Sequence, residues 1–172
     1  MLFDILLVVV LVICFVTDFK RQKIYNAVIF PSLVTAYVLN IFFSGFNGFK
    51  FSLLGFFTGL CILLIPYLLG GMGAGDVKLL SFIGALKGSF FVLNTAVYMA
   101  LIGGVIALMI IMFRKDSIKF IKSIFLWLFS FFSGVKYTID FSTSGFSQKY
   151  PYGTAIVLGA FICLLFKGAW II

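Results

Sequence analysis

The sequence predicts an all-α protein that crosses a membrane about six times. Its composition is 63% hydrophobic and 10% charged, with a mean hydropathy of +1.25, which leaves a soluble fold too little polar surface. The hydrophobic residues also fall into long runs separated by short polar or glycine-rich segments. A chain of 172 residues has room for about six spans of roughly 20 residues each. We therefore expect one transmembrane domain over residues 1–172.

The spans can be placed in order from the hydrophobic runs. They are predicted at residues 2–17, 25–43 and 51–69, at two segments within 77–113, and at residues 154–170. The first run has no basic segment before it and no small-residue cleavage site after it, so we expect a retained helix and not a signal peptide. A turn is predicted at residues 44–48. A single helix over 77–113 would be about 55 Å long, too long for one crossing, so a reversal is expected between Lys87 and Asn94.

The basic residues predict the topology. Lysine and arginine concentrate in the segments after the first, third and fifth spans, which are therefore expected on the cytoplasmic side, with both termini outside. Residues 118–132 mix lysines with aromatic and aliphatic side chains, a pattern typical of a helix that lies in the membrane interface. A seventh span there is the alternative, but it would place the carboxy terminus inside.

Charge and cysteine usage exclude several function classes. The net charge is +8, but the basic residues are scattered beside hydrophobic runs, which favours contacts with membrane lipids over a nucleic-acid partner. Cys14, Cys61 and Cys163 lie in three separate runs, no C-x-x-C pair is present, and the chain has no histidine. Neither a metal site nor a disulfide framework is predicted, and we expect no cofactor. The three cysteines are expected to be small buried side chains.

A glycine-dense break carries the most informative acidic residue. The chain has five acidic residues, all aspartates, and Asp76 follows the glycines at the edge of a hydrophobic run. A carboxylate beside the membrane interior is costly and needs a reason. Gly73 and Gly75 allow unusual backbone dihedrals and close approach to an extended peptide. The alternative is a flexible loop in which Asp76 caps the helix that follows.

The predicted topology gives Asp76 a partner. Asp18 closes the first span and Asp76 opens the fourth, so both are expected at the cytoplasmic ends of their helices. Two adjacent carboxylates share a proton, and the pair can supply both a general base and a general acid for peptide hydrolysis. Alternatively, Asp18 is a solvated ion-pair partner of the basic residues that follow it. A different class of function also remains open, in which the two aspartates form a proton or cation site in a small transporter or an assembly subunit.

Three motifs resemble one family. Residues 73–79, Gly-Ala-Gly-Asp-Val-Lys-Leu, are similar to the GxGD-[VIL]-K-[LM] core of the type IV prepilin peptidases, which are GxGD-type membrane aspartyl proteases. Asp18, Arg21 and Ile24-Tyr25-Asn26 resemble the family's first-aspartate motif, with Tyr25 where proline is usual. Residues 150–155, Tyr-Pro-Tyr-Gly-Thr-Ala, resemble the proline-containing motif that opens the last helix. The three matches occur in order along most of the chain.

The resemblance implies an activity, a place and a set of residues. It implies an aspartic endopeptidase of the cytoplasmic (inner) membrane that cuts the short basic leader of prepilin-like proteins at the cytoplasmic face, in type IV pilus assembly or secretion. Asp18 and Asp76 would be catalytic. The supporting or substrate-binding positions would be Gly73, Gly75, Lys78, Arg21, Asn26 and Pro151. Larger members carry a cysteine-rich segment and methylate the new amino terminus; the chain resembles the short protease-only branch, and methylation is not expected.

The remaining features have structural interpretations. Asp4 is expected at the outer interface without a catalytic role, and Asp116 and Asp140 as loop charges. Lys78 is able to tune the pair or bind a backbone carbonyl, or it extends to the interface as a snorkelling lysine. Glycines within the spans are expected to allow close helix packing.

Overall fold

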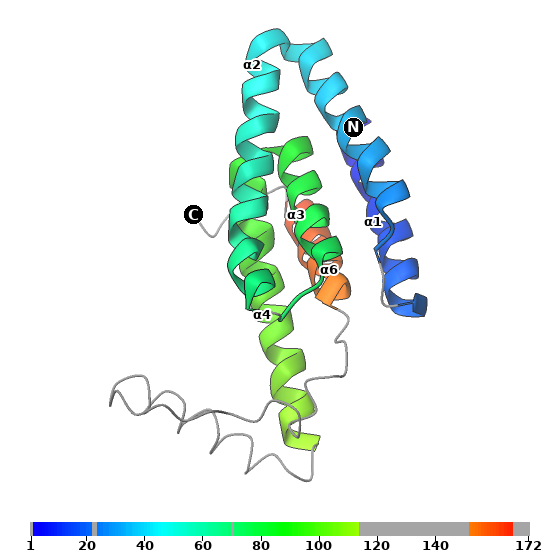
Figure 1. The fold of residues 1–172 in the computed structure, drawn as a ribbon, viewed down its shortest axis with the longest axis vertical. Coiled ribbons are helices and arrows are strands. Elements are labelled where there is room, and N and C mark those ends of the chain that lie inside the picture. Colours follow the sequence, from blue (N-terminus) through cyan, green and yellow to red (C-terminus); the bar gives the residue numbers. More distant parts are fainter. Residues whose placement is uncertain (1, 22–23, 70, 114–151, 167–172) are drawn as a thin grey trace, which may run out of the picture. The chain divides into compact units, whose positions relative to one another are not determined.

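The chain folds into helices, as predicted. The computed structural model describes residues 2–21, 24–69, 71–113 and 152–166, and these contain no strand. The helices are α1 (Leu2–Arg21), α2 (Asn26–Leu68), α3 (Ala74–Lys87), α4 (Ser89–Phe113) and α6 (Tyr152–Leu165) (Figure 1). The interfacial helix predicted at 118–132 lies outside the described residues.

The chain divides into two units. The first comprises residues 1–103 and 151–172, and the second residues 104–150. Of the second unit, the structure describes the end of α4, residues 104–113. The prediction of a single domain over residues 1–172 stays a prediction, and Asp18 and Asp76 both lie in the first unit.

Helix α2 consists of two halves joined by a reversal at Gly45. This residue has φ 56° and ψ −136°, the one non-helical conformation within α2, and a positive φ favours glycine. A Cβ on Gly48 would overlap the backbone oxygen of Asn40. In a straight helix these residues would be about 12 Å apart, so the chain must fold back between them, as Figure 1 shows. The reversal falls within the turn predicted at residues 44–48.

A second glycine separates α3 from α4. Gly88 has φ 87°, and its N–H donates to the backbone oxygen of Gly84 at 2.7 Å to close the last turn of α3. A residue with positive φ after the last helical residue is a common way to end a helix. The break lies within the segment from Lys87 to Asn94 where a reversal was predicted.

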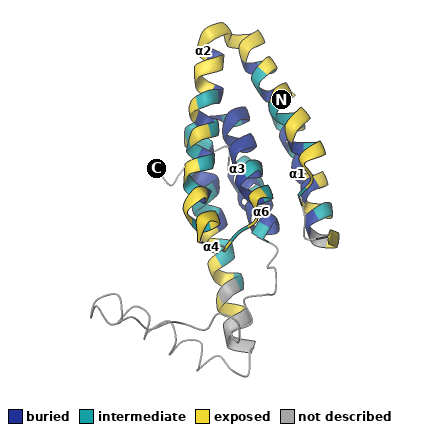
Figure 2. Ribbon diagram, in the orientation of Figure 1, coloured by how far each residue is buried: buried dark blue, intermediate teal, exposed yellow. Residues whose placement is uncertain are grey.

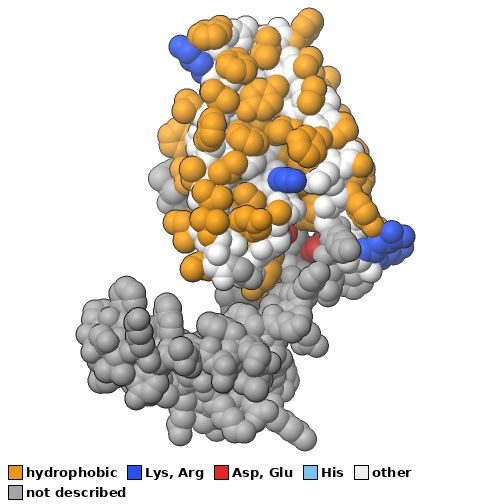
Figure 3. All heavy atoms as spheres, viewed as in Figure 1, with side chains coloured by type: hydrophobic (Ala, Val, Ile, Leu, Met, Phe, Trp, Pro, Cys, Tyr) orange, Lys and Arg blue, Asp and Glu red, His pale blue; other side chains and the backbone are white. Residues whose placement is uncertain are grey.

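The surface of the helices is suited to lipid. Two helical segments, Asn26–Leu68 and Ser89–Ile106, are long and apolar enough to cross a membrane. The outward faces of α1 and α2 are exposed (Figure 2), and among the described residues hydrophobic side chains far outnumber charged ones on the face seen in Figure 3. Both observations fit a membrane protein. The six spans and the outward termini stay predictions.

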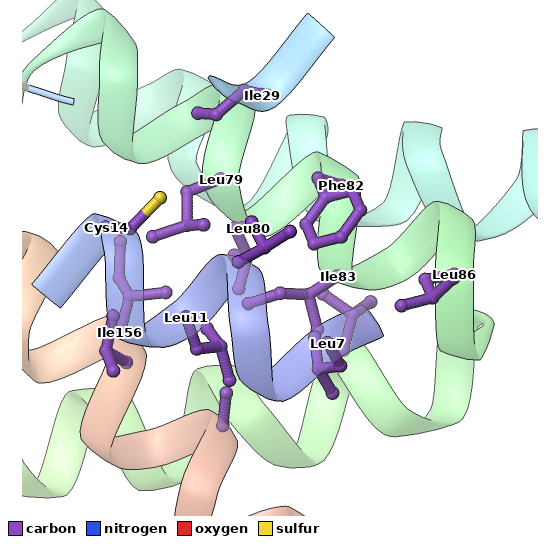
Figure 4. Packing of buried hydrophobic residues seen from close by; sticks show 14 of the residues in the cluster. Leu7, Leu11, Cys14, Ile29, Leu79, Leu80, Phe82, Ile83, Leu86 and Ile156 are labelled. Carbon is purple, nitrogen blue, oxygen red and sulfur yellow. The ribbon is translucent and has the colours of Figure 1, made fainter. Parts of the chain in front are cut away.

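Helix α3 forms the centre of the first unit. All its residues from Asp76 to Leu86 are buried except the partly buried Lys78, whereas α1 and α2 keep one exposed face (Figure 2). Side chains from three other helices close over it (Figure 4). They include Leu7, Leu11 and Cys14 of α1, Ile29 of α2 and Ile156 of α6.

Glycines allow the helices around this core to touch. A Cβ on Gly55 of α2 would overlap the backbone oxygen of Gly84 of α3, and a Cβ on Gly84 would overlap the oxygen of Gly55. A Cβ on Gly159 of α6 would lie 2.8 Å from the backbone nitrogen of Met99 in α4. These positions confirm the predicted role of glycines in close packing. Gly103, in contrast, has open space where a Cβ would lie.

The cysteine prediction is right for two residues and wrong for one. Cys14 and Cys163 are buried, but Cys61 is exposed. Cys61 lies on the outward face of α2, where a small apolar side chain suits lipid as well as it suits a protein core.

An ion pair fixes how α1 and α3 align. Lys87 Nζ at the end of α3 donates to Asp4 Oδ1 at the start of α1. Because the start of one helix meets the end of the other, the two helices run antiparallel. Asp18 lies about 21 Å further along α1, and Asp76 about 17 Å back along α3. The pairing therefore brings both aspartates to the same end of the bundle.

Candidate active site

Three helix ends converge around the two aspartates. They are the last turn of α1, which carries Asp18, the first turn of α3, which carries Asp76, and the first turn of α6. The backbone N–H of Thr154 in α6 donates to Asp18 Oδ2 at 2.9 Å. Ile24 lies against the Cβ positions of both Gly75, which precedes Asp76, and Gly153, which lies against the Asp18 carboxylate. The structure thus brings together the two residues that the sequence predicted as a pair.

Asp76 belongs to the first turn of α3, and its side chain accepts a hydrogen bond from the residue that precedes the helix. Gly73 is the residue before the helix, and its N–H donates to Asp76 Oδ2 at 3.1 Å. Asp76 therefore satisfies an amide that the helix itself leaves unpaired. Its side chain is nevertheless buried, with 8% of its surface exposed. The predicted capping role is correct in part, because Asp76 caps from inside the first turn, but a cap at a solvated loop does not require this burial.

Asp18 is equally buried, with 5% of its surface exposed. Its carboxylate accepts a hydrogen bond from the amide of Thr154, on a helix far away in the sequence. Such burial does not fit a solvated ion pair with the basic residues that follow it. The N-terminal end of α6 instead provides both a hydrogen bond and the positive end of a helix dipole.

Both carboxyl groups are protonated more readily than an ordinary aspartate. They lie outside the predicted spans, which end at residue 17 and resume at residue 77. Burial raises the pKa of Asp76 to about 6; the Gly73 N–H opposes this rise, and the charge of Asp18 adds to it. Burial also raises the pKa of Asp18, against the lowering effect of the Thr154 N–H. A buried pair with raised pKa values is able to hold one proton near neutral pH.

The raised pKa of Asp76 predicts a gain in stability on replacement by asparagine. A carboxyl whose pKa is higher in the folded state than its ordinary 3.8 stabilises the fold below pH 3.8, and this stability is lost as pH rises through about 6. Above that pH, Asp76→Asn should raise the free energy of unfolding by about 2 to 3 kcal/mol. Thermal unfolding in detergent should show a higher Tm for the variant at pH 7.5, with the gap closing towards pH 4. A variant less stable than the natural protein at pH 7.5 would contradict this account.

The predicted supporting residues near Asp76 have defined contacts. A Cβ on Gly75 would lie 2.9 Å from Ile24 Cβ, so glycine is needed there for close approach and not for a special dihedral. Lys78 Nζ donates to Asn26 Oδ1 at 2.9 Å and lies 5.4 Å from the centre of the Phe30 ring. Lys78 thereby ties α3 to the start of α2. Of the two roles predicted for Lys78, the structure thus shows a hydrogen bond, and its acceptor is the side chain of Asn26.

The first-aspartate motif is also held by its own side chains. Arg21 donates through a guanidinium nitrogen to the hydroxyl of Tyr25 at 2.9 Å. Tyr25 precedes α2 with φ −82° and ψ 128°, close to the values that proline adopts. Tyrosine at this position therefore keeps the backbone that the usual proline would impose. Pro151, the last predicted supporting residue, lies outside the described residues.

Sequence reasoning missed three residues of this site. Gly153 and Thr154 belong to the motif that opens α6, but its proline was singled out because proline is the stronger sequence signal. The sequence places Ile24 in the first-aspartate motif but predicts no role for it. It contacts the positions of both Gly75 and Gly153, where a Cβ would lie 2.9 Å and 3.1 Å from its side chain. A backbone amide as partner has no sequence signature, so Thr154 could not have been found this way.

The described residues offer no metal site. Within residues 2–113, apart from the gaps at 22–23 and 70, and within 152–166, no three potential ligands from His, Cys, Asp and Glu gather at one point. The predicted lack of a cofactor stays an expectation.

Comparison with known proteins now assigns the chain to a family. The model of the type IV leader peptidase family matches residues 5–108. The chain belongs to this family. Neither a curated protein nor a solved structure matches it. The family match confirms the resemblance that the motifs predicted and implies a peptidase. The matched segment contains Asp18 and Asp76 and ends before α6.

Proposed function

We propose that this type IV leader peptidase family member is an aspartic endopeptidase with Asp18 and Asp76 as its catalytic carboxylates. The observation that carries the proposal is the meeting of the α1 and α3 ends, where both aspartates are buried and Ile24 links the glycines beside them, Gly153 and Gly75. The pair matches the needs of peptide hydrolysis, which requires a base for water and an acid for the carbonyl. Family membership supports the peptidase class.

Each carboxyl has an assigned role in this proposal. Asp76, whose pKa burial raises to about 6, carries the shared proton in the active form of the pair and donates a hydrogen bond to the scissile carbonyl oxygen. Asp18 is ionised and takes a proton from the attacking water, whose oxygen bonds to the carbonyl carbon. When the carbon–nitrogen bond breaks, Asp18 passes that proton to the leaving nitrogen. Water is consumed, and both carboxyl groups return to their starting states.

The proposed substrate is a prepilin-like protein with a short basic leader and a hydrophobic helix. Lys20 and Arg21 follow Asp18, and Lys78 follows Asp76, so the site end of the bundle carries basic residues. By the positive-inside rule this end faces the cytoplasm. A substrate helix in the membrane would present its leader junction at that depth. We expect an extended peptide to dock beside the glycine-rich segment before Asp76, with Gly73, Gly75, Lys78, Arg21, Asn26 and Pro151 as supporting residues.

Purified protein in lipid vesicles tests the proposal. It should cut a pilin-like substrate at a single bond after the basic leader, and mass spectrometry should give one new amino terminus. With a methyl donor present, that terminus should stay unmethylated. A substrate without the hydrophobic helix serves as the control and should be cut poorly. An absence of cleavage by folded protein, together with proton or cation flux across the vesicles, would contradict the proposal in favour of a transport site.

A further inference from the structure

Asp18 sits at an unfavourable end of its own helix. It lies in the last turn of α1 (Leu2–Arg21), where unpaired carbonyl groups make the helix end partly negative. It is also buried, with 5% of its surface exposed. Both conditions disfavour the ionised form that the proposed mechanism requires of Asp18. Something outside α1 must therefore favour its negative charge.

The first turn of α6 supplies the missing compensation. Thr154 is the third residue of α6 (Tyr152–Leu165), so its N–H belongs to the first turn, whose N–H groups are available to cap interactions from outside the helix. This N–H donates to Asp18 Oδ2 at 2.9 Å. The bond is charge-assisted when Asp18 is ionised, and charge-assisted bonds are the stronger kind. Asp18 therefore acts as the cap of a helix that begins far away in the sequence.

Gly153 makes this approach possible. A Cβ at this position would lie 2.7 Å from Asp18 Oδ2, 2.8 Å from Asp18 Cγ and 3.1 Å from Ile24 Cδ1. The first two distances are shorter than any ordinary contact of a Cβ atom. Asp18 has little room to retreat, because its side chain is buried among neighbouring atoms. Any residue other than glycine would push the carboxylate and the amide apart.

Ile24 extends the same arrangement to Asp76. It occupies the space that a Cβ on Gly153 would need, and it also meets the position of a Cβ on Gly75 at 2.9 Å. Gly75 directly precedes Asp76 in the first turn of α3. Ile24 thus packs against the first turns of both α3 and α6, at positions where a glycine leaves space for its side chain. This contact spaces the first turn of α3, which carries Asp76, from the first turn of α6, which donates to Asp18.

We propose that Gly153 and Thr154 are positioning residues for the catalytic pair, holding Asp18 ionised and in place beside Asp76 through the first turn of α6. This inference rests on the proposed function, since it assigns a task within that reaction. It gives α6 a part in the chemistry, although α6 lies beyond the residues 5–108 that the family model matches. A role in packing alone would leave the protonation of the site unchanged.

The pH dependence of kcat/KM for leader cleavage separates these two roles. The acidic limb of that profile reports the loss of the ionised carboxylate of the pair. Gly153→Ala should move the acidic limb to higher pH by about one pH unit, because the lost hydrogen bond no longer favours ionisation. Gly159→Ala is the matched control, since it also crowds α6, but against Met99 and away from Asp18. It should lower stability and leave the limb where it is.

Thr154→Pro provides a second route to the same result. It removes the N–H that donates to Asp18, and proline is tolerated in the first turn of a helix. Thr154→Ala keeps the N–H and controls for the lost hydroxyl. We expect the acidic limb of the kcat/KM profile to move to higher pH for Thr154→Pro, and to stay at the pH of the natural protein for Thr154→Ala.

The outcomes distinguish this inference from the proposed function. If the natural protein cuts no leader, the proposed function fails. If it cuts, and Asp18→Asn and Asp76→Asn do not, an unshifted acidic limb in Gly153→Ala and Thr154→Pro overturns the positioning role alone. Failure of both variants to fold, while Gly159→Ala folds, would assign this turn a purely structural role and also overturn the inference.

Discussion

Asp18→Asn and Asp76→Asn should each abolish leader cleavage while the protein still folds. Asparagine keeps the size and the acceptor oxygen that the Thr154 and Gly73 amides require, but it can neither take a proton from water nor share one with its partner. We expect kcat to fall by at least about 10³-fold for each variant, as for other catalytic groups that act as a unit. The measurement is a cleavage assay at equal amounts of folded protein. Substantial processing by either variant would show that the reaction does not need the pair.

The other three aspartates serve as controls. Asp116→Asn and Asp140→Asn should cleave at near-normal rates, because both residues are predicted loop charges. Asp4→Asn should do the same, although it removes the ion pair with Lys87. A partly exposed pair of this kind contributes about 1 kcal/mol or less, so the variant should be slightly less stable and otherwise active. Loss of activity in Asp4→Asn with folding intact would move the reaction away from the proposed site.

Gly84→Ala should be strongly destabilising although it adds a single methyl group. Its Cβ would overlap the backbone oxygen of Gly55, and the reciprocal contact leaves neither helix free to give. Because the clash is between backbones, α2 and α3 must separate, and the buried face of α3 loses its packing. We expect a loss of about 2 to 4 kcal/mol in the free energy of unfolding. Thermal unfolding in detergent, or the yield of folded protein, provides the measurement.

Gly103→Ala is the matched control for this substitution. The chemical change is identical, but a Cβ at Gly103 meets open space within α4. The greater helix propensity of alanine should leave stability unchanged or raise it by up to about 1 kcal/mol. Equal losses in Gly84→Ala and Gly103→Ala would mean that the contact between α2 and α3 is not what makes Gly84 necessary.

Much of this fold follows from hydrophobic runs and glycines. The runs predict helices, and the structure forms them. The turn at 44–48 contains Gly45, where α2 reverses, and the break after Lys87 contains Gly88, where α3 ends. Both glycines have a positive φ. These features are local, so sequence patterns detect them. The burial of Cys61 was predicted wrongly because a hydrophobic run in a membrane protein does not tell a lipid-facing position from a core position.

The aspartate pair was predictable because topology constrains depth. Charge bias placed the end of the first span and the start of the fourth on one side, and motif resemblance then selected Asp18 and Asp76. The ion pair of Asp4 with Lys87, which aligns α1 with α3, was not predicted, because pairing between distant helices depends on their rotation. For the same reason the sequence does not predict that the amide of Thr154 donates to Asp18, or that Ile24 packs against the first turns of α3 and α6. Such contacts come from tertiary packing and leave no periodic trace in the sequence.

Crosslinking of thiols at the two aspartate positions tests the central claim that Asp18 and Asp76 form one site. The variant would carry Asp18→Cys and Asp76→Cys, with alanine in place of the native Cys14, Cys61 and Cys163. A bifunctional thiol reagent that bridges only adjacent cysteines should join the pair in folded protein in lipid. The control pair, Asp4→Cys with Asp76→Cys, should not be joined, because Asp4 lies about 21 Å along α1 from Asp18. Absence of a crosslink between positions 18 and 76, when both thiols react with a monofunctional reagent, would contradict the account.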